Sequence, residues 1–406
     1  MTGNGLQGPL LGLRATHEGY APVVTGLIMS GYFGGLIAGS KITPILVQRV
    51  GHVRVFAALA SIVSISALLH IVYISPIAWI WMRVSTGFCF AGLYIVAESW
   101  LNDRISNETR GKMLAIYMVV NLGGMGSGPL LLNIADPGSF ELFVLVSILF
   151  SFSLVPILLT VGSVPPFEAP VQIKLNALYK ETPLGVAGCF VTGISNGAFI
   201  GIGAVYAEKM GLTVTEISLF MTIALWGGVL FQWPIGILSD KFDRRLILTA
   251  VTFAAAGIAV SGLFFNVFGL YILMIVVGIF GGLTLPMYSL SLAFTNDRLI
   301  PEQMVAASGS LVMITGLGAV FGPMISGAAM SFIGTHGFFG YLAMIHLIFG
   351  LYAIYRIKSV PGIPAEEQGP SVYLPRTSSV AAATAFEDEV KEGSEEIISN
   401  STASTS

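Results

Sequence analysis

The sequence predicts an all-α polytopic membrane protein in which twelve transmembrane helices form two related halves. Of the 406 residues, 54% are hydrophobic and only 10% are charged, and the mean hydropathy is +0.83, which is too apolar for a soluble chain of this length. The apolar residues form continuous runs of the length that a helix of about 20 residues needs to cross a bilayer. One region of the chain also recurs in diverged form in its second part.

The repeat relates the region from Arg83 to Pro129 to a region 194 positions later. Its recurrence predicts that the chain consists of two related halves. The matching positions are Gly87 with Gly281, Tyr94 with Tyr288, Asn102-Asp103-Arg104 with Asn296-Asp297-Arg298, and Gly124-x-x-x-Gly128-Pro129 with Gly318-x-x-x-Gly322-Pro323.

The apolar runs and polar turns predict a domain organisation. We expect the first half at 1–161, a linker at 162–182, the second half at 183–358 and a disordered acidic tail, rich in Ser and Thr, at 359–406. The expected spans are 1–13, 21–47, 55–74, 79–101, 113–134, 140–161, 183–206, 216–238, 246–266, 269–294, 304–333 and 337–357.

The first run is shorter than a transmembrane helix. At a rise of about 1.5 Å per residue, a helix over 1–13 reaches only about 20 Å. The sequence therefore predicts a truncated first helix and a start codon farther upstream.

Charge placement predicts the orientation in the membrane. Basic residues concentrate in alternate loops, so the positive-inside rule places these loops, the linker and the tail in the cytoplasm. The residues are Lys41, Arg49, Arg54, Arg104, Arg110, Lys112, Lys174, Lys180, Lys241, Arg244, Arg245 and Arg298.

Several classes of function have no support in the sequence. Cys89 and Cys189 are isolated, and the five histidines lack ligand spacing, so we expect no metal site and no cofactor. A net charge of −3 favours no nucleic-acid partner. The pattern G-x-x-x-x-G-K-[ST] is absent and no nucleophile cluster is visible, so we expect neither ATP-driven transport by this chain nor an enzyme.

One loop motif resembles that of a known family. The run Gly236-Ile237-Leu238-Ser239-Asp240-Lys241-Phe242-Asp243-Arg244-Arg245 is similar to the motif G-x-L-a-D-r-x-G-r-r of the major facilitator superfamily, although Asp243 replaces a glycine. Its first-half counterpart at 44–54 keeps the basic residues but has Gln48 in place of the acid. The runs at 98–104 and 231–236, together with Arg110-Gly111 and Tyr117, are similar to the YcaD-like branch.

This resemblance covers about residues 1–358. It implies a monomeric secondary transporter of the bacterial inner membrane, with a small-molecule substrate and a proton gradient as the driving force.

The loop charges are candidates for gating. A carboxylate at a helix end that meets basic groups stabilises one arrangement of the halves, and the alternative is that these charges only set topology. The candidates are Asp240, Arg244, Arg245, Arg49, Arg54, Asp103, Arg104 and Arg110.

The repeated glycine motif has two interpretations. Glycines four positions apart lie on one helix face and admit a neighbouring backbone, and the following proline permits a bend. Its resemblance to the fifth-span motif of the family favours antiport, whereas ordinary helix packing is the alternative. The residues are Gly124, Gly128, Pro129, Gly318, Gly322 and Pro323.

Polar residues within the spans are candidates for the substrate site. A charge in hydrocarbon is costly unless it faces a wet cavity or a partner, which makes Arg83 the foremost candidate. Glu98 is a candidate for proton coupling or for pairing with Arg104 or Arg110. Helix-to-helix hydrogen bonding and interfacial snorkelling are the alternatives. The substrate candidates are Asn4, Gln7, Arg83, Tyr94, Asn196 and Tyr288.

Taken together, these features predict a transporter that alternates access to a midplane cavity, with a small anionic or zwitterionic substrate preferred over a cation. Efflux of an amphipathic compound and a transporter-like sensor are the alternatives.

Overall fold

The computed structural model of the chain describes residues 1–104, 110–159, 173–264, 269–359 and 368. The expected tail lies almost entirely outside the described residues, as does the first part of the expected linker. The remainder of that linker contains the short helix α7, Leu175–Glu181.

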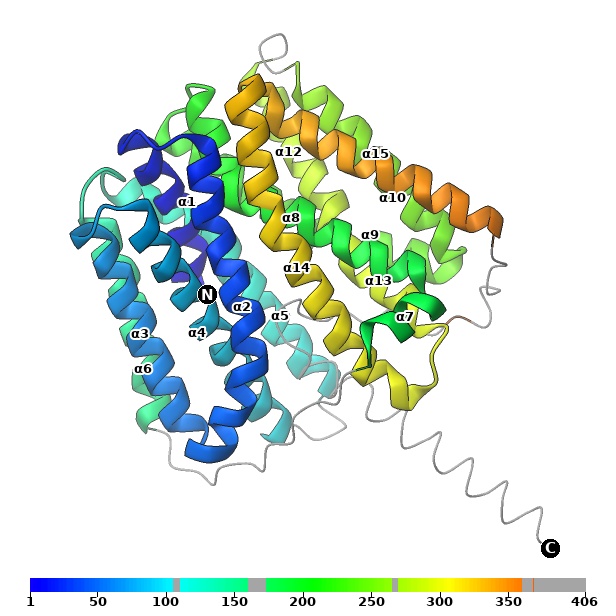
Figure 1. Cartoon of the computed structure of the whole chain (residues 1–406), viewed down its shortest axis with the longest axis horizontal. Coiled ribbons are helices and arrows are strands. Elements are labelled where there is room, and N and C mark those ends of the chain that lie inside the picture. The colour runs from blue at the N-terminus through cyan, green and yellow to red at the C-terminus, as the bar shows by residue number, and fades with distance from the viewer. Residues whose placement is uncertain (105–109, 160–172, 265–268, 360–367, 369–406) are drawn as a thin grey trace, which may run out of the picture.

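The described residues of the first half form a bundle of helices that cross back and forth between two ends of the molecule (Figure 1). Its helix α1 extends to His17, beyond the run expected from hydropathy, because the polar residues after Leu13 continue the helix instead of forming a turn. The elements are α1 Thr2–His17, α2 Pro22–Val50, α3 His52–Val72, α4 Pro76–Arg104, α5 Arg110–Ser127, the 3-10 helix η2 Gly128–Ile134 and α6 Glu141–Leu159.

The second half is a similar bundle beside the first. One of its predicted spans is broken at Leu285–Pro286, because Pro286 has no N–H for the helical ladder. The elements are α8 Pro183–Lys209, α9 Val214–Lys241, α10 Arg244–Gly262, α12 Leu270–Thr284, α13 Met287–Asn296, α14 Pro301–Ile333 and α15 His336–Ser359.

Within the described residues, ten helices are long and apolar enough to cross a membrane, with α12 and α13 counted as one span. The all-α membrane fold predicted from the sequence is confirmed. The expected total of twelve also requires α1, which has 16 residues, and α5 continued by η2.

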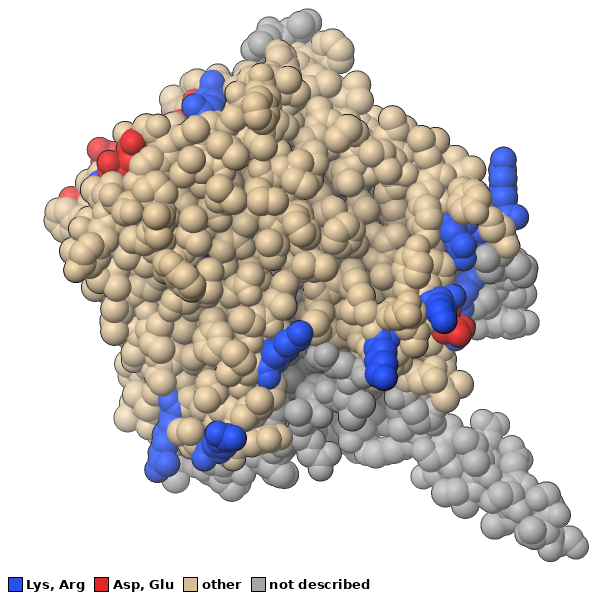
Figure 2. Space-filling view, in the orientation of Figure 1, with Lys and Arg blue, Asp and Glu red and all other residues tan. Residues whose placement is uncertain are grey.

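The two ends of the bundles differ in charge. We call the end that carries Arg49, Arg54, Lys241 and Arg245 the basic end, and the end that carries His17, Asn133, Glu208 and Thr215 the opposite end. Most Lys and Arg side chains visible in Figure 2 lie along the lower and right-hand edges of the view, where the basic end lies.

Candidate functional site

A cavity of about 200 Å³ lies between the two halves near mid-height of the helices. It is lined by α1, α2, α4 and α5 of the first half and by α8, α9, α13 and α14 of the second, together with Leu285. Most of its wall is apolar. Because both halves contribute walls, any relative movement of the halves changes the cavity.

Arg83 is the charged group of this cavity among the described lining residues. Its side chain is 5% exposed, and its guanidinium carbon lies 4.5 Å from the centre of the Tyr32 ring. The Nε and Nη1 atoms make no hydrogen bond to any described residue. The Asn4 amide donates to the Tyr32 hydroxyl over 3.1 Å. Arg83, Tyr32 and Asn4 therefore form one polar patch in a largely apolar wall.

Glycines bring this patch together. A Cβ on Gly87 of α4 would lie 1.8 Å from the carbonyl oxygen of Tyr32 in α2, and one on Gly35 would lie 2.0 Å from the carbonyl oxygen of Val84. The two helices therefore pack backbone against backbone, which places Tyr32 beside Arg83. Sequence reasoning did not single out Tyr32. The glycines around it, Gly31 and Gly35, were the available signal, since they indicate a close helix contact.

The structure brings four of the six predicted substrate residues to the cavity wall. They are Asn4, Arg83, Tyr94 and Asn196, and the wall also includes Asn121, Gln232, Ser289 and Thr315. Tyr94 is 2% exposed and Asn196 is 8% exposed, so both reach the cavity from a packed helix surface.

Gln7 and Tyr288 do not line the cavity. Tyr288 lies in an apolar cluster with Leu178, Cys189 and Leu311, because the break at Pro286 directs Leu285 and Ser289 to the cavity instead. Gln7 is 1% exposed and lies inside the protein away from the cavity wall.

Glu98 is buried on α4, where it is 3% exposed. Its Oε1 accepts a hydrogen bond of 2.8 Å from the Tyr117 hydroxyl, and the Asn121 amide donates to that hydroxyl over 3.4 Å. Because Asn121 lines the cavity, a chain of polar groups joins Glu98 to it. The side chains of Arg104 and Arg110, its other expected partners, lie outside the described residues.

Both copies of the glycine motif contact a backbone. A Cβ on Gly318 would lie 2.2 Å from the carbonyl oxygen of Phe190, and one on Gly322 would lie 2.2 Å from that of Ile194, both in α8. In the first half, Gly128 would meet the backbone of Gly5 at 2.6 Å. Pro129 lies in the first turn of η2, where α5 changes to 3-10 geometry, whereas Pro323 lies within the continuous helix α14.

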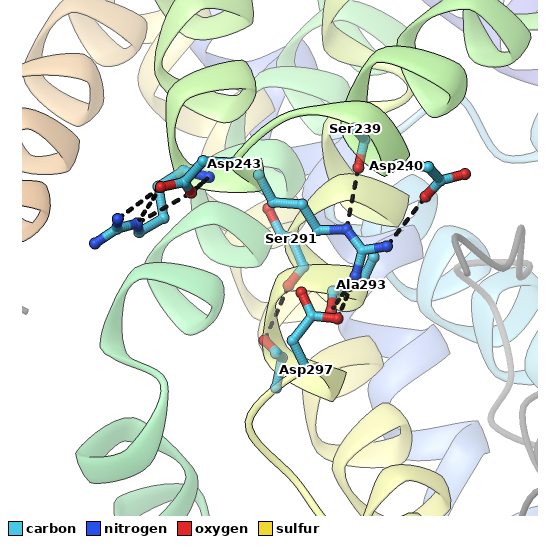
Figure 3. A network of polar contacts seen from close by, with 9 residues as sticks. Ser239, Asp240, Asp243, Ser291, Ala293 and Asp297 are labelled. Atoms are coloured by element: carbon cyan, nitrogen blue, oxygen red, sulfur yellow. Dashed lines mark hydrogen bonds and ion pairs between the residues drawn. The ribbon is translucent and has the colours of Figure 1, made fainter. Parts of the chain in front are cut away.

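At the basic end, Arg244 of α10 donates hydrogen bonds to residues of α9 and α13, among them Ser239 and Ala293, which Figure 3 labels. It is 2% exposed and forms ion pairs with Asp240, over 3.1 Å, and with Asp297. It also donates to the Ser239 hydroxyl and to the Ala293 carbonyl, each over 3.2 Å. The residues of the family-like motif thus join α9, α10 and α13.

Asp243, which replaces the usual glycine of the motif, begins α10. Its Oδ1 accepts from the backbone N–H of Arg245 over 2.9 Å, and its Oδ2 forms an ion pair with the Arg245 guanidinium over 2.6 Å. Partial burial raises the pKa of the Asp243 carboxyl, but the hydrogen bonds and charge of Arg245 outweigh it, and the pKa lies below its ordinary value. The corresponding Gly51 has φ of +93°, whereas Asp243 has φ of −54°.

The first-half counterpart of this network is different. Arg49 and Arg54 are exposed, and His52, at the position that matches Arg244, bonds through Nε2 to the Ser99 hydroxyl over 3.0 Å. Asp103 corresponds to Asp297 in the repeat, but the side chains of Asp103, Arg104 and Arg110 lie outside the described residues.

At the opposite end, polar contacts join the halves. Asn133 of η2 donates to the Ser218 hydroxyl over 2.9 Å and accepts from the Thr215 hydroxyl over 2.7 Å. His17 and Glu208 lie 3.3 Å apart. Further toward mid-height, the Ser30 hydroxyl donates to the Val320 carbonyl over 2.6 Å. These contacts hold the halves together on this side of the cavity.

The fold and the shared cavity define the class: a polytopic membrane protein built from two similar helical bundles around one cavity. The sequence model of the Major Facilitator Superfamily matches residues 1–188 and 184–390, and the chain belongs to this superfamily.

Its relatives include an uncharacterized MFS-type transporter, YcaD, of Escherichia fergusonii, 27% identical over 326 residues, which are 79% of this chain and 83% of that protein. The YcaD of Salmonella arizonae is 28% identical over 308 residues, 75% of this chain and 79% of that protein. These relatives confirm the resemblance to the YcaD-like branch.

Among solved structures, the fold is similar to the nucleoside transporter NupG, with a TM-score of 0.74, 14% identity, and coverage of 88% of this chain and 98% of that one. It is also similar to a D-xylose-proton symporter, with a TM-score of 0.68, 14% identity, and coverage of 90% and 95%. At these identities the likeness shows the fold alone.

Proposed function

We propose that this protein is a secondary active transporter that moves a small solute by alternating access, with proton movement as the driving force. The observation that carries this proposal is the cavity at mid-height whose walls come from both halves. A solute bound there contacts both bundles, so rocking of one bundle against the other exposes it to one side of the membrane and then to the other.

The charge distribution supports an orientation in which the basic end faces the cytoplasm. The C-terminal helix α15 ends at the basic end, with Arg356 and Lys358 in its last turn. In this orientation the tail is cytoplasmic. We propose the bacterial inner membrane as the location, because the relatives come from enterobacteria.

The contacts that join the halves at the opposite end support an assignment of this structure to the inward-facing side of the cycle. Outward opening requires the Asn133 hydrogen bonds and the His17–Glu208 contact to break. At the basic end, Arg244 and its two aspartates hold three helices of the second half together. We therefore propose that this network makes the second half move as one rigid body when the basic end opens or closes.

Proton coupling is assigned to Glu98. A buried carboxyl binds and releases a proton readily when its surroundings alternate between dry and wet, and the Tyr117–Asn121 chain connects it to the cavity. Tyr117 supplies a hydroxyl that both donates and accepts, as transfer along such a chain requires.

A measurement of distance tests alternating access without a known substrate. Spin labels on Tyr73→Cys and Lys209→Cys, both at exposed positions of the opposite end and in different halves, report on its opening by electron double resonance in lipid nanodiscs. We expect two distances whose proportions change with pH. The control pair, Tyr73→Cys with Phe140→Cys, lies within the first half and is expected to give one distance.

A single unchanging distance for the pair between the halves, at every pH, would contradict the proposal and favour a protein that binds without translocating.

A further inference from the structure

We infer that the solute is a small amphipathic monoanion, a carboxylate with an apolar body, whose carboxylate binds at Arg83. This inference rests on the proposed function, because it assigns the chemistry of the cavity in which the solute is carried. It follows from the charge of the cavity, from the position of its charged group and from the nature of the remaining wall.

The charge of the cavity requires an anion. Arg83 is 5% exposed, its contact is the face of the Tyr32 ring, and its Nε and Nη1 donors meet no acceptor in the described residues. None of the described residues that line the cavity is acidic. A buried cation without an anion is costly, and an anionic solute removes that cost by supplying charge-assisted hydrogen bonds. A cationic solute would be repelled by Arg83.

The described residues that line the cavity also limit the solute to one negative charge. The polar groups elsewhere on the described wall are amides and hydroxyls, such as Asn121, Asn196 and Ser289. They can accept or donate hydrogen bonds, but they carry no charge to balance a second carboxylate. A dianion would therefore leave one charge desolvated and unpaired in a largely apolar cavity.

The position of Arg83 defines where the charged group lies. Tyr32 lies under the guanidinium, and its hydroxyl accepts from Asn4, so the ring and the guanidinium are held by three helices of the first half. Asn196 reaches the same cavity from α8 of the second half, and its Nδ2 makes no hydrogen bond to described residues. The second bundle therefore offers an amide donor to the same cavity that Arg83 lines.

The remaining wall suits an apolar body. Met118 and Met125 of α5, Leu225 and Val229 of α9, and Leu285 all line the cavity. Methionine side chains are flexible and polarisable, so they adapt to apolar groups of different shape. Burial of an apolar body against this wall adds affinity in proportion to its area, whereas a sugar would leave many hydroxyls without partners there.

The test compares four probes that share a phenyl group and differ in charge: phenylbutyrate, phenylbutylamine, phenylbutanol and phenylsuccinate. The purified full chain is melted in detergent at neutral pH with each probe, because binding to the folded state raises the melting temperature. We expect phenylbutyrate to raise it most, phenylbutanol to raise it less, and the amine and the dianion to have no effect.

Variants assign the effect to Arg83. In Arg83→Gln the dissociation constant of phenylbutyrate should rise about tenfold to a hundredfold, because a charge-assisted contact is lost. Arg83→Lys keeps the charge and should retain part of the affinity. Lys209→Gln, which removes an exposed cation at the opposite end, should bind as the unmodified protein does.

Equal stabilisation by the amine or the dianion, or an undiminished phenylbutyrate response in Arg83→Gln, would overturn the inference. If Arg83→Gln does not fold, the ranking of the four probes on the unmodified protein decides. Uptake of radiolabelled phenylbutyrate into proteoliposomes separates the two proposals. Arg83-dependent binding without uptake supports this solute class but contradicts transport, whereas carrier-dependent uptake of the amine alone supports transport but contradicts this solute class.

Discussion

Asp243 replaces the glycine of the family motif and serves as the N-cap of α10. It caps α10 by accepting from the Arg245 N–H, and an Asp at this position stabilises a helix start by about 1 kcal/mol relative to Ala. We therefore expect Asp243→Ala to lower the free energy of unfolding by about that amount, and Asp243→Asn to lose less because Asn also caps well. Thermal melting of the two variants compares them.

The same residue has a pH dependence with a defined sign. Because its pKa is lowered in the folded protein, its stabilisation is complete above the ordinary Asp pKa and is lost as the pH falls through the lowered value. Asp243→Asn should remove this acid-dependent part of the melting curve. If the melting temperature falls equally with decreasing pH in both proteins, other carboxylates cause the acid dependence.

Arg244 has one buried and one exposed carboxylate partner, which gives a matched pair of variants. Asp297 is 3% exposed and Asp240 is 43% exposed. Removal of a buried partner costs about 3–5 kcal/mol, whereas an exposed pair contributes about 0–1 kcal/mol. Asp297→Asn should therefore lower the melting temperature clearly and Asp240→Asn only slightly. Similar shifts would show that solvent exposure does not determine the strength of these pairs.

Glu98 and Tyr117 test the proton pathway. We expect Glu98→Gln to abolish uptake driven by a pH gradient in proteoliposomes while solute exchange across the membrane continues, since exchange needs no net proton movement. Tyr117→Phe should slow the driven uptake about tenfold or more, because it removes the hydroxyl between Glu98 and Asn121. Undiminished driven uptake in Glu98→Gln would place the proton elsewhere.

Among helices, contact between α8 and α14 depends on the absence of side chains. A Cβ at Gly322 would lie 2.2 Å from the Ile194 carbonyl oxygen and 2.7 Å from the Ala198 nitrogen. Gly322→Ala should therefore force the two helices apart and cost about 1–3 kcal/mol. Gly257→Ala in α10 is the matched control, because a Cβ there meets nothing within 4 Å.

The control should be neutral or stabilising by up to about 1 kcal/mol, since Ala favours helix over Gly. Melting temperatures in one detergent compare the pair. A loss of stability in both variants would point to a general intolerance of alanine and not to the contact between α8 and α14.

For the whole molecule, the Asn133 contact is where the two halves can be locked. Its amide lies within hydrogen-bond distance of Thr215 and Ser218 in α9. A short thiol crosslinker applied to Asn133→Cys/Thr215→Cys should stop transport, and cleavage of the crosslinker should restore it. The protein without the two substitutions is the control. The crosslinker should not affect it, because its native cysteines, Cys89 and Cys189, are buried. Full transport by the crosslinked protein would contradict opening at this end.

The residues at the cavity show which site predictions could be made from the sequence. Arg83 could be predicted as a site residue because a charge within an apolar run is costly unless it faces a cavity or a partner. Tyr32 could not, because a tyrosine among glycines is equally consistent with packing. Tyr94 and Tyr288 occupy matching positions of the repeat, yet only Tyr94 reaches the cavity, because Pro286 breaks the second-half helix just before Tyr288.

The sequence by itself determined the membrane class, the two related halves and the family, because hydropathy, repeats and motifs are properties of short or aligned segments. The tertiary structure alone decided which polar residues share the cavity and which charges pair. Arg83 meets Tyr32 only because Gly87 lets α4 pack against the backbone of α2, and Arg244 meets Asp297 only because α10 and α13 lie side by side. Such contacts depend on the rotation and separation of helices, which no local pattern of residues encodes.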